Sequence, residues 1–149
     1  MTGSNHAVTG ALIAVAVPQA AIAIPVALLS HFVLDALPHY GDNDNHSWLD
    51  RHFMYVLGID AAISTAFLVS LAIWQPENWV LMVVCALVSI APDLVWVKYL
   101  IADHKGIENQ HGAFARFSKW IQWGERPWGI YIEIATLISL LAVFFTVVD

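Results

Sequence analysis

Charged side chains are scarce in this sequence. Aspartate, glutamate, lysine and arginine together make up 12% of the 149 residues, whereas hydrophobic residues make up 59%. In a soluble domain about a quarter of the residues are charged, because its surface must be hydrated. So few charges cannot cover a domain of this size. The composition therefore excludes a soluble globular protein and predicts an integral membrane protein.

Cysteine and basic residues are scarce as well. The single cysteine, Cys85, lies inside an apolar run, so no intramolecular disulfide can form. The cysteine content therefore does not indicate whether the protein lies in an oxidising or a reducing compartment. Six basic residues against twelve acidic ones give a net charge of −6. A protein that binds nucleic acid needs a basic face, so the charge excludes nucleic acid as a partner.

Five apolar segments follow one another along the chain, over residues 7–17, 20–37, 53–74, 79–101 and 130–148. A helix that spans a membrane needs about 20 residues, and the last three segments meet that length. Residues 7–17 form only about half a span, and Pro18 follows them. We therefore expect a single all-α domain over residues 1–149, an integral membrane bundle of about five helices. It begins with a short helical hairpin that turns at Pro18 and Gln19.

Two polar connections, residues 38–52 and 103–128, separate these segments. In the second, aromatic residues alternate with Arg116, Lys119 and Gln122, a pattern typical of an amphipathic helix lying in the membrane interface before the last span. All six basic residues lie in or beside the two connections. Because basic residues collect on the cytoplasmic side, the sequence predicts a multi-pass protein with both connections in the cytoplasm.

Ionisable side chains also occur within the apolar segments, where each is costly and therefore points to a functional site. They are His31, Asp35, Asp60, Asp93 and Glu133, with His6 at the membrane edge. The orientation inferred from lysine and arginine puts all six in the same half of the bilayer. We therefore expect one polar site near the cytoplasmic face.

His31 and Asp35 form the strongest local pattern. They are four residues apart, so an imidazole nitrogen and a carboxylate oxygen share one helix face and can reach the same cation. This donor pair suits a divalent metal, zinc first, or manganese or iron where more oxygen ligands are present. The alternative is that Asp35 only orients His31, or that the two form a plain polar pair at a helix end.

Asp60 and Asp93 each lie in an apolar helix with no lysine or arginine at helical spacing to neutralise them. An unpaired carboxylate in a bilayer either takes up a proton or binds a cation. We therefore predict both as metal ligands. The alternative is a protonated carboxyl group that hydrogen-bonds between helices. His6 is a further predicted ligand, and its alternative is an interfacial histidine without a functional role. For Glu133 we expect a side chain that extends to the membrane interface, and the alternatives are a metal ligand or a general base.

Two histidines outside the apolar segments complete the candidate site. Pro38 ends the second helix and can direct His39 back toward the site, and His111 lies in the second polar connection. An imidazole beside a metal-bound water can accept its proton, so His39 and His111 are the candidate general bases. For His111 the alternative is an ordinary surface histidine.

These residues resemble a family of small bacterial inner-membrane proteins, the membrane-bound metal-dependent hydrolases. The resemblance rests on His6-Ala-Val-Thr-Gly10, on Ser30-His31-Phe-Val-Leu-Asp35 with Pro38-His39, and on Pro92-Asp93. It implies a metal bound by His6, His31, Asp35 and Asp93, and a location in the bacterial inner membrane. The chain lacks the Asp-x-Asp-His and His-Arg-Gly-x-Thr-His-Ser runs of the better-known branch, which indicates a divergent branch.

The stretch from His31 to His39 is also similar to the His-x-x-x-Asp…Pro-x-His stretch of zinc-dependent phospholipase C. Phosphoester hydrolysis is therefore the first chemistry to consider, with a metal-activated water as nucleophile and a membrane lipid or lipid-like molecule as substrate. Two other functions stay open. One is translocation of metal ions or protons, with Asp60 and Asp93 as a relay, and the other is a non-catalytic membrane scaffold. A homo-oligomer is left open in each case.

Overall fold

The computed structural model describes residues 1–41, 51–104 and 112–148, and these residues are almost entirely helical. The six α-helices are α1 (Gly3–Ala16), α2 (Ala20–Asp35), α3 (Arg51–Trp74), α4 (Trp79–His104), α5 (Ala113–Ile121) and α6 (Gly129–Val147). The other described elements are the short 3-10 helix η1 (Gln122–Gly124) and two strands, β1 (His39–Tyr40) and β2 (Glu125–Arg126). The prediction of an all-α chain is confirmed.

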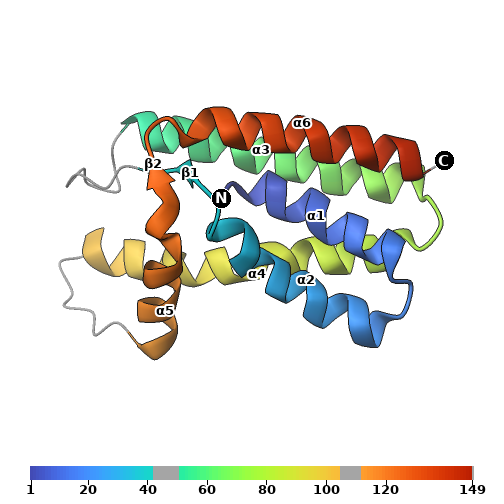
Figure 1. Ribbon diagram of the computed structural model, residues 1–149, viewed down its shortest axis with the longest axis horizontal. Coiled ribbons are helices and arrows are strands. Elements are labelled where there is room, and N and C mark those ends of the chain that lie inside the picture. Colours follow the sequence, from blue (N-terminus) through green and yellow to red (C-terminus); the bar gives the residue numbers. More distant parts are fainter. Residues whose placement is uncertain (42–50, 105–111, 149) are drawn as a thin grey trace.

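Helix α1 lies in the middle of the bundle and packs against α2, α3, α4 and α6 (Figure 1). Small side chains on α1, among them the fully buried Ala7 and Ala11, allow the neighbouring helices to approach closely. Gly10 makes the tightest contact. A β-carbon at this position would clash with the Cys85 carbonyl group on α4, so the contact requires glycine.

The predicted N-terminal hairpin is present, with its turn between Ala16 and Ala20. Pro18 lies in that turn, and proline cannot continue the hydrogen-bond ladder of α1. At 14 residues α1 is about 21 Å long, too short to cross a bilayer core of about 30 Å. Its central position covers it on all sides with other helices, which is where a short membrane helix is tolerated.

One end of the bundle gathers most of the polar elements. The start of α1, the end of α2 and the starts of α3 and α6 lie at this end, and α5 crosses it (Figure 1). Strands β1 and β2 pair in parallel there, with His39 opposite Glu125. Gly129 at the start of α6 permits this arrangement, because a β-carbon there would clash with the carbonyl group of His39.

The bundle has an apolar surface and a partly polar interior. Ile59, Ile73 and Leu94 are more than half exposed, whereas His31 and Asp35 are buried. Within the described residues, two helices are long and apolar enough to cross a membrane, α3 over Phe53–Trp74 and α6 over Gly129–Val147. Only 11% of the most apolar stretch of each is buried, so neither is the core helix of a soluble protein.

The other apolar helices are shorter, namely Ala20–Asp35 in α2 and Trp79–Val95 in α4. The full span over residues 79–101 stays a prediction, because the described side chains of α4 end at Val95.

Candidate metal centre

One carboxylate from each of four surrounding helices approaches the first two turns of α1. They are Asp35 of α2, Asp60 of α3, Asp93 of α4 and Glu133 of α6. The first N–H groups of a helix have no acceptor within the helix and carry partial positive charge. The start of α1 therefore attracts anionic side chains, and α1 adds the fully buried imidazole of His6.

The packing of α1 against α4 sets the position of His6. The two helices run in opposite directions (Figure 1). They approach most closely where Gly10 meets the backbone of Cys85. One turn closer to the start of α1, the Nε2 atom of His6 lies 3.9 Å from an oxygen of Asp93, which is two turns beyond Cys85 on α4. The glycine contact thus brings the polar residues of the two helices to the same level.

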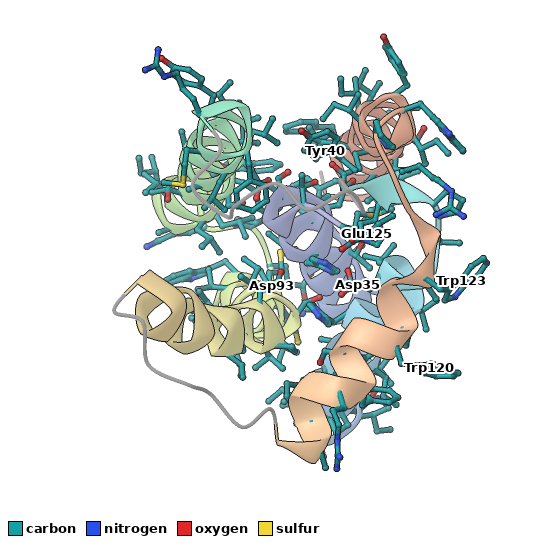
Figure 2. The ribbon with its side chains drawn as sticks, turned by 90° about the vertical axis from the view of Figure 1, so that its left-hand side faces the viewer. Asp35, Tyr40, Asp93, Trp120, Trp123 and Glu125 are labelled. Carbon is teal, nitrogen blue, oxygen red and sulfur yellow. The ribbon has the colours of Figure 1, made fainter. Side chains whose placement is uncertain are left out.

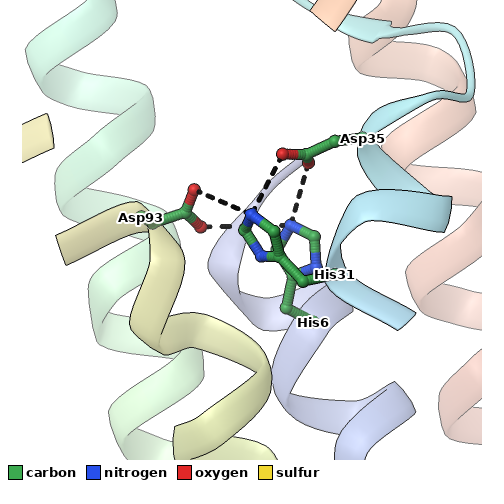
Figure 3. Close-up of side chains that lie close together, drawn as sticks. All are labelled: His6, His31, Asp35 and Asp93. Atoms are coloured by element: carbon green, nitrogen blue, oxygen red, sulfur yellow. Dashed lines mark hydrogen bonds and ion pairs between the residues drawn. The ribbon is translucent and has the colours of Figure 1, made fainter. Parts of the chain in front are cut away.

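Four of the five predicted metal ligands form one cluster (Figure 3). Asp35 bridges the two imidazoles from one side, with Oδ1 3.1 Å from His6 Nε2 and Oδ2 3.1 Å from His31 Nε2. Asp93 approaches from the opposite side, with an oxygen 3.8 Å from His31 Nε2. The two rings stack with their centroids 4.2 Å apart. One donor atom from each residue lies within 4.8 Å of the others, so the cluster could hold a metal ion.

The hydrogen bonds of His31 determine which nitrogen faces the cluster centre. Nδ1 lies 2.9 Å from the carbonyl oxygen of Ser89, and because a carbonyl only accepts, Nδ1 donates its proton there. In the neutral ring Nε2 then carries a lone pair, which points at oxygens of Asp35 and Asp93. Three acceptors facing one another repel unless a positive species lies between them, either a proton on Nε2 or a metal ion.

Donor type and spacing both suit a divalent cation. Two imidazole nitrogens and two carboxylates are ligands used for zinc, and also for manganese or iron. Bonds of about 2.1 Å put opposite ligands at most about 4.2 Å apart, so donors that now lie up to 4.8 Å apart need to move slightly inward. Asp93 has room for this movement. Its side chain is 33% exposed, whereas those of the other three are at most 3% exposed.

One further contact and one unpartnered nitrogen complete the polar surroundings of the cluster. The amino group of Met1 is buried and lies 2.6 Å from Asp35 Oδ1, so it adds positive charge at the carboxylate. Nδ1 of His6 is buried and has no hydrogen-bond partner within the described part of the chain. A buried nitrogen without a partner is costly. His6 is therefore held in place by packing and by the contacts of Nε2.

The fifth predicted ligand, Asp60, is not brought into the cluster. Its two oxygens accept hydrogen bonds from the backbone N–H groups of Gly3, at 2.8 Å, and Ser4, at 2.9 Å. These N–H groups have no acceptor within α1. Asp60 therefore caps the helix that carries His6, and its charge interacts favourably with the helix dipole.

We expect Asp60→Ala to destabilise the fold while leaving the candidate metal cluster in place. The variant leaves two N–H groups of α1 without their acceptor, and the loss of a helix cap costs about 1 kcal/mol, up to about 2. Thermal unfolding in detergent should occur at lower temperature, with unchanged zinc stoichiometry in the folded protein. If the folded variant loses the metal, Asp60 is a ligand after all.

The prediction for Glu133 is wrong. We expected its side chain to extend to the membrane interface, but it is 3% exposed. Its Oε1 atom accepts a hydrogen bond of 3.0 Å from the backbone N–H of Thr2. The exposed N–H groups at the start of α1 draw this carboxylate inward, just as they draw Asp60.

His39 lies at the same end of the bundle but outside the cluster. Its Nδ1 donates to the carbonyl oxygen of Leu37 at 2.8 Å, and its Nε2 lies 3.9 Å from Glu125 Oε1. Burial lowers the pKa of the His39 imidazole, and the nearby amino group of Met1 lowers it further. The ring is therefore neutral at pH 7 and presents a lone pair at Nε2. The other candidate base, His111, lies outside the described residues.

Sequence analysis misses two parts of this site. The carbonyl group of Ser89, which fixes the tautomer of His31, belongs to the backbone and leaves no trace in residue type. The only available signal is a serine in an apolar helix one turn before Asp93. Glu125 is placed opposite His39 by the pairing of β1 with β2. That contact joins distant segments, so no local pattern indicates it.

Comparison of the chain with protein families, with curated proteins and with solved structures gives no match. The resemblance to the membrane-bound metal-dependent hydrolases therefore stays a prediction. The function has to follow from the cluster itself and from the surface around it.

Proposed function

We propose that the protein is a membrane-embedded, metal-dependent hydrolase that cleaves a lipid phosphoester or a similar lipid substrate. One observation carries the proposal, namely that Nε2 of His31 lies 3.1 Å from an oxygen of Asp35 and 3.8 Å from an oxygen of Asp93 in a mostly buried cluster. A cation stabilises such a group of acceptors, which is otherwise costly away from water. His6 supplies the fourth candidate metal ligand, with its Nε2 atom 3.1 Å from Asp35 Oδ1.

The surface of the bundle supports a position in the membrane. Helices α3 and α6, with 24 and 19 residues, measure about 36 and 28 Å, close to the thickness of a bilayer core. Exposed aromatic side chains lie near both ends of these helices, with Trp128 and Tyr131 at one end and Trp74 at the other. Aromatic residues favour the two membrane interfaces. We place the protein in the bacterial inner membrane, with the cluster and the basic residues toward the cytoplasm.

The chemistry follows from the donor set and its access. A divalent cation, zinc by preference, would lower the pKa of a bound water and polarise the ester oxygen. Asp93 is the exposed member of the cluster, so water and substrate reach the site beside it. His39 presents a neutral imidazole near Glu125 and is the candidate acceptor for the proton of that water. A site near the end of the bundle also lies at the depth of lipid head-group linkages.

The test is metal content and hydrolysis measured on the same purified protein. Elemental analysis after gentle detergent extraction should find about one divalent ion per chain. Hydrolysis of a chromogenic phosphodiester in micelles should stop when a chelator is added and return with zinc. A folded protein that neither retains nor takes up metal would contradict the proposal and favour a scaffold with protonated His31. Bound metal without any phosphoester hydrolysis would contradict the enzymatic part.

A further inference from the structure

The outer face of α5, η1 and β2 carries exposed indoles and guanidinium groups together. Trp120 is 71% exposed and Trp123 65% exposed, and Figure 2 shows both side chains pointing away from the bundle. Arg116 and Arg126 are exposed on the same segment. We call these four residues the indole–arginine surface.

This segment is basic although the chain is acidic. Residues 112–128 contain three of the six basic residues and only one of the twelve acidic residues. The Arg126 side chain donates from Nη1 to the carbonyl oxygens of Trp123, at 3.3 Å, and Glu125, at 2.6 Å. These bonds hold a guanidinium group against the backbone of an exposed tryptophan. A fixed guanidinium group suits phosphate oxygens, and an indole suits the membrane interface.

A row of ring contacts fixes α5 in this orientation and links it to the cluster. Phe117 and Phe114 pack against Phe32 of α2, with ring centroids 5.4 and 6.2 Å apart. Phe32 contacts the ring of His31 at 5.0 Å. The inner face of α5 is therefore occupied by α2, next to a candidate metal ligand. Trp120 of the indole–arginine surface points outward from the same helix (Figure 2).

We infer that the indole–arginine surface binds the headgroups of anionic phospholipids and gathers them beside the His/Asp cluster. Arginine binds phosphate oxygens through parallel N–H donors, and basic residues at a membrane surface attract anionic lipids. Trp128 and Tyr131, the next exposed aromatic residues along the chain, lie at the start of α6, where Ile134 and Ile138 are also exposed. This combination of interfacial rings and an apolar helix matches a lipid leaflet. If the protein is the proposed hydrolase, its substrate class is then an anionic phospholipid, and this consequence rests on the proposed function.

The experiment measures which lipid lies next to the indoles. The full chain is reconstituted into phosphatidylcholine nanodiscs that contain an equal small fraction of either brominated phosphatidylglycerol or brominated phosphatidylcholine. Bromine quenches tryptophan fluorescence on contact. We expect at least about twofold stronger quenching by the anionic lipid, and loss of this preference at high ionic strength.

Variants identify the residues responsible. W120F/W123F should remove the lipid-selective part of the quenching, and R116Q/R126Q should make the two brominated lipids equal. Trp74→Phe, at the opposite end of the bundle, is the matched control and should leave the preference unchanged. Equal quenching by both lipids in the wild-type protein, or a preference that persists in R116Q/R126Q or at high salt, would overturn the inference.

Metal content measured on the same nanodiscs separates this inference from the proposed function. If the metal is retained and no lipid preference is seen, the inferred lipid-binding role of the surface is rejected and the proposed function is not affected. If a lipid preference is seen without any bound metal, the proposed hydrolase function and its substrate class are rejected, and the surface is still a lipid-binding site.

Discussion

Asp35→Asn is expected to abolish stoichiometric metal binding in a protein that remains folded. Asp35 faces both imidazoles, with one oxygen 3.1 Å from His6 Nε2 and the other 3.1 Å from His31 Nε2. The amide keeps the shape of the side chain but removes its charge and one of its two acceptor oxygens. Mutation of a residue that only hydrogen-bonds to a metal ligand weakens metal affinity by about 10- to 100-fold. Because Asp35 is itself a candidate ligand, loss of its charge should weaken the affinity more. Zinc titration against a competing chelator measures the effect.

His31→Ala should have the same effect by a different route, because it removes one of the two imidazoles that contact both carboxylates of the cluster. Asp60→Asn is the matched control. It also neutralises an aspartate that faces the start of α1, but it acts on the helix cap and should keep the metal. Full zinc binding by both Asp35→Asn and His31→Ala, with normal helix content, would end the metal-centre hypothesis.

Sequence patterns predict this fold as far as local rules reach. The lengths of the apolar segments predict the helices, and Pro18 predicts the hairpin. The lateral order of the helices does not follow from such patterns. That α1 is the central helix depends on Gly10 meeting a backbone carbonyl on α4, and glycine at one position indicates close packing without naming the partner. The pairing of β1 with β2 is likewise a contact between distant segments.

For the candidate site as well, the sequence predicts at what level along its helix each carboxylate lies, but not in which direction its side chain faces. Counting residues from the helix ends puts Asp35, Asp60, Asp93 and Glu133 at one level, and the structure brings all four to the start of α1. What each one faces depends on how its helix is rotated. Asp35 and Asp93 face imidazoles, whereas Asp60 and Glu133 face backbone N–H groups. Depth follows from helix length and hydropathy, but the rotation of a helix with an apolar outer surface does not.

These two pairs of carboxylates have complementary effects on His6. Asp60 and Glu133 hold the start of α1 through Thr2, Gly3 and Ser4. Asp35 and Asp93 are then reached by the side chain that follows one turn later. The capping bonds therefore stabilise the element that positions a candidate ligand. This explains why the apolar helices carry four carboxylates at one end of the bundle although only two belong to the cluster.

Gly10→Ala is expected to weaken both folding and metal binding. The added β-carbon would clash with the Cys85 carbonyl group and lie 2.9 Å from the Cα atom of Ala86, and backbone atoms cannot rotate away. Helices α1 and α4 must then separate, and overpacking of this kind costs about 1–3 kcal/mol. His6 and Asp93 lie on these two helices, so their separation should increase and zinc affinity should fall. Thermal unfolding in detergent and zinc titration measure the two effects.

Gly58→Ala provides the comparison that isolates the helix contact. Gly58 lies in α3, and a β-carbon there would have nothing within 4 Å. The substitution should leave zinc affinity unchanged and should stabilise α3 by up to about 1 kcal/mol, because alanine is the better helix former. If Gly10→Ala resembles Gly58→Ala in both measurements, the contact between α1 and α4 does not set the position of His6 against Asp93. A selective loss in Gly10→Ala would tie the candidate metal centre to that one helix crossing.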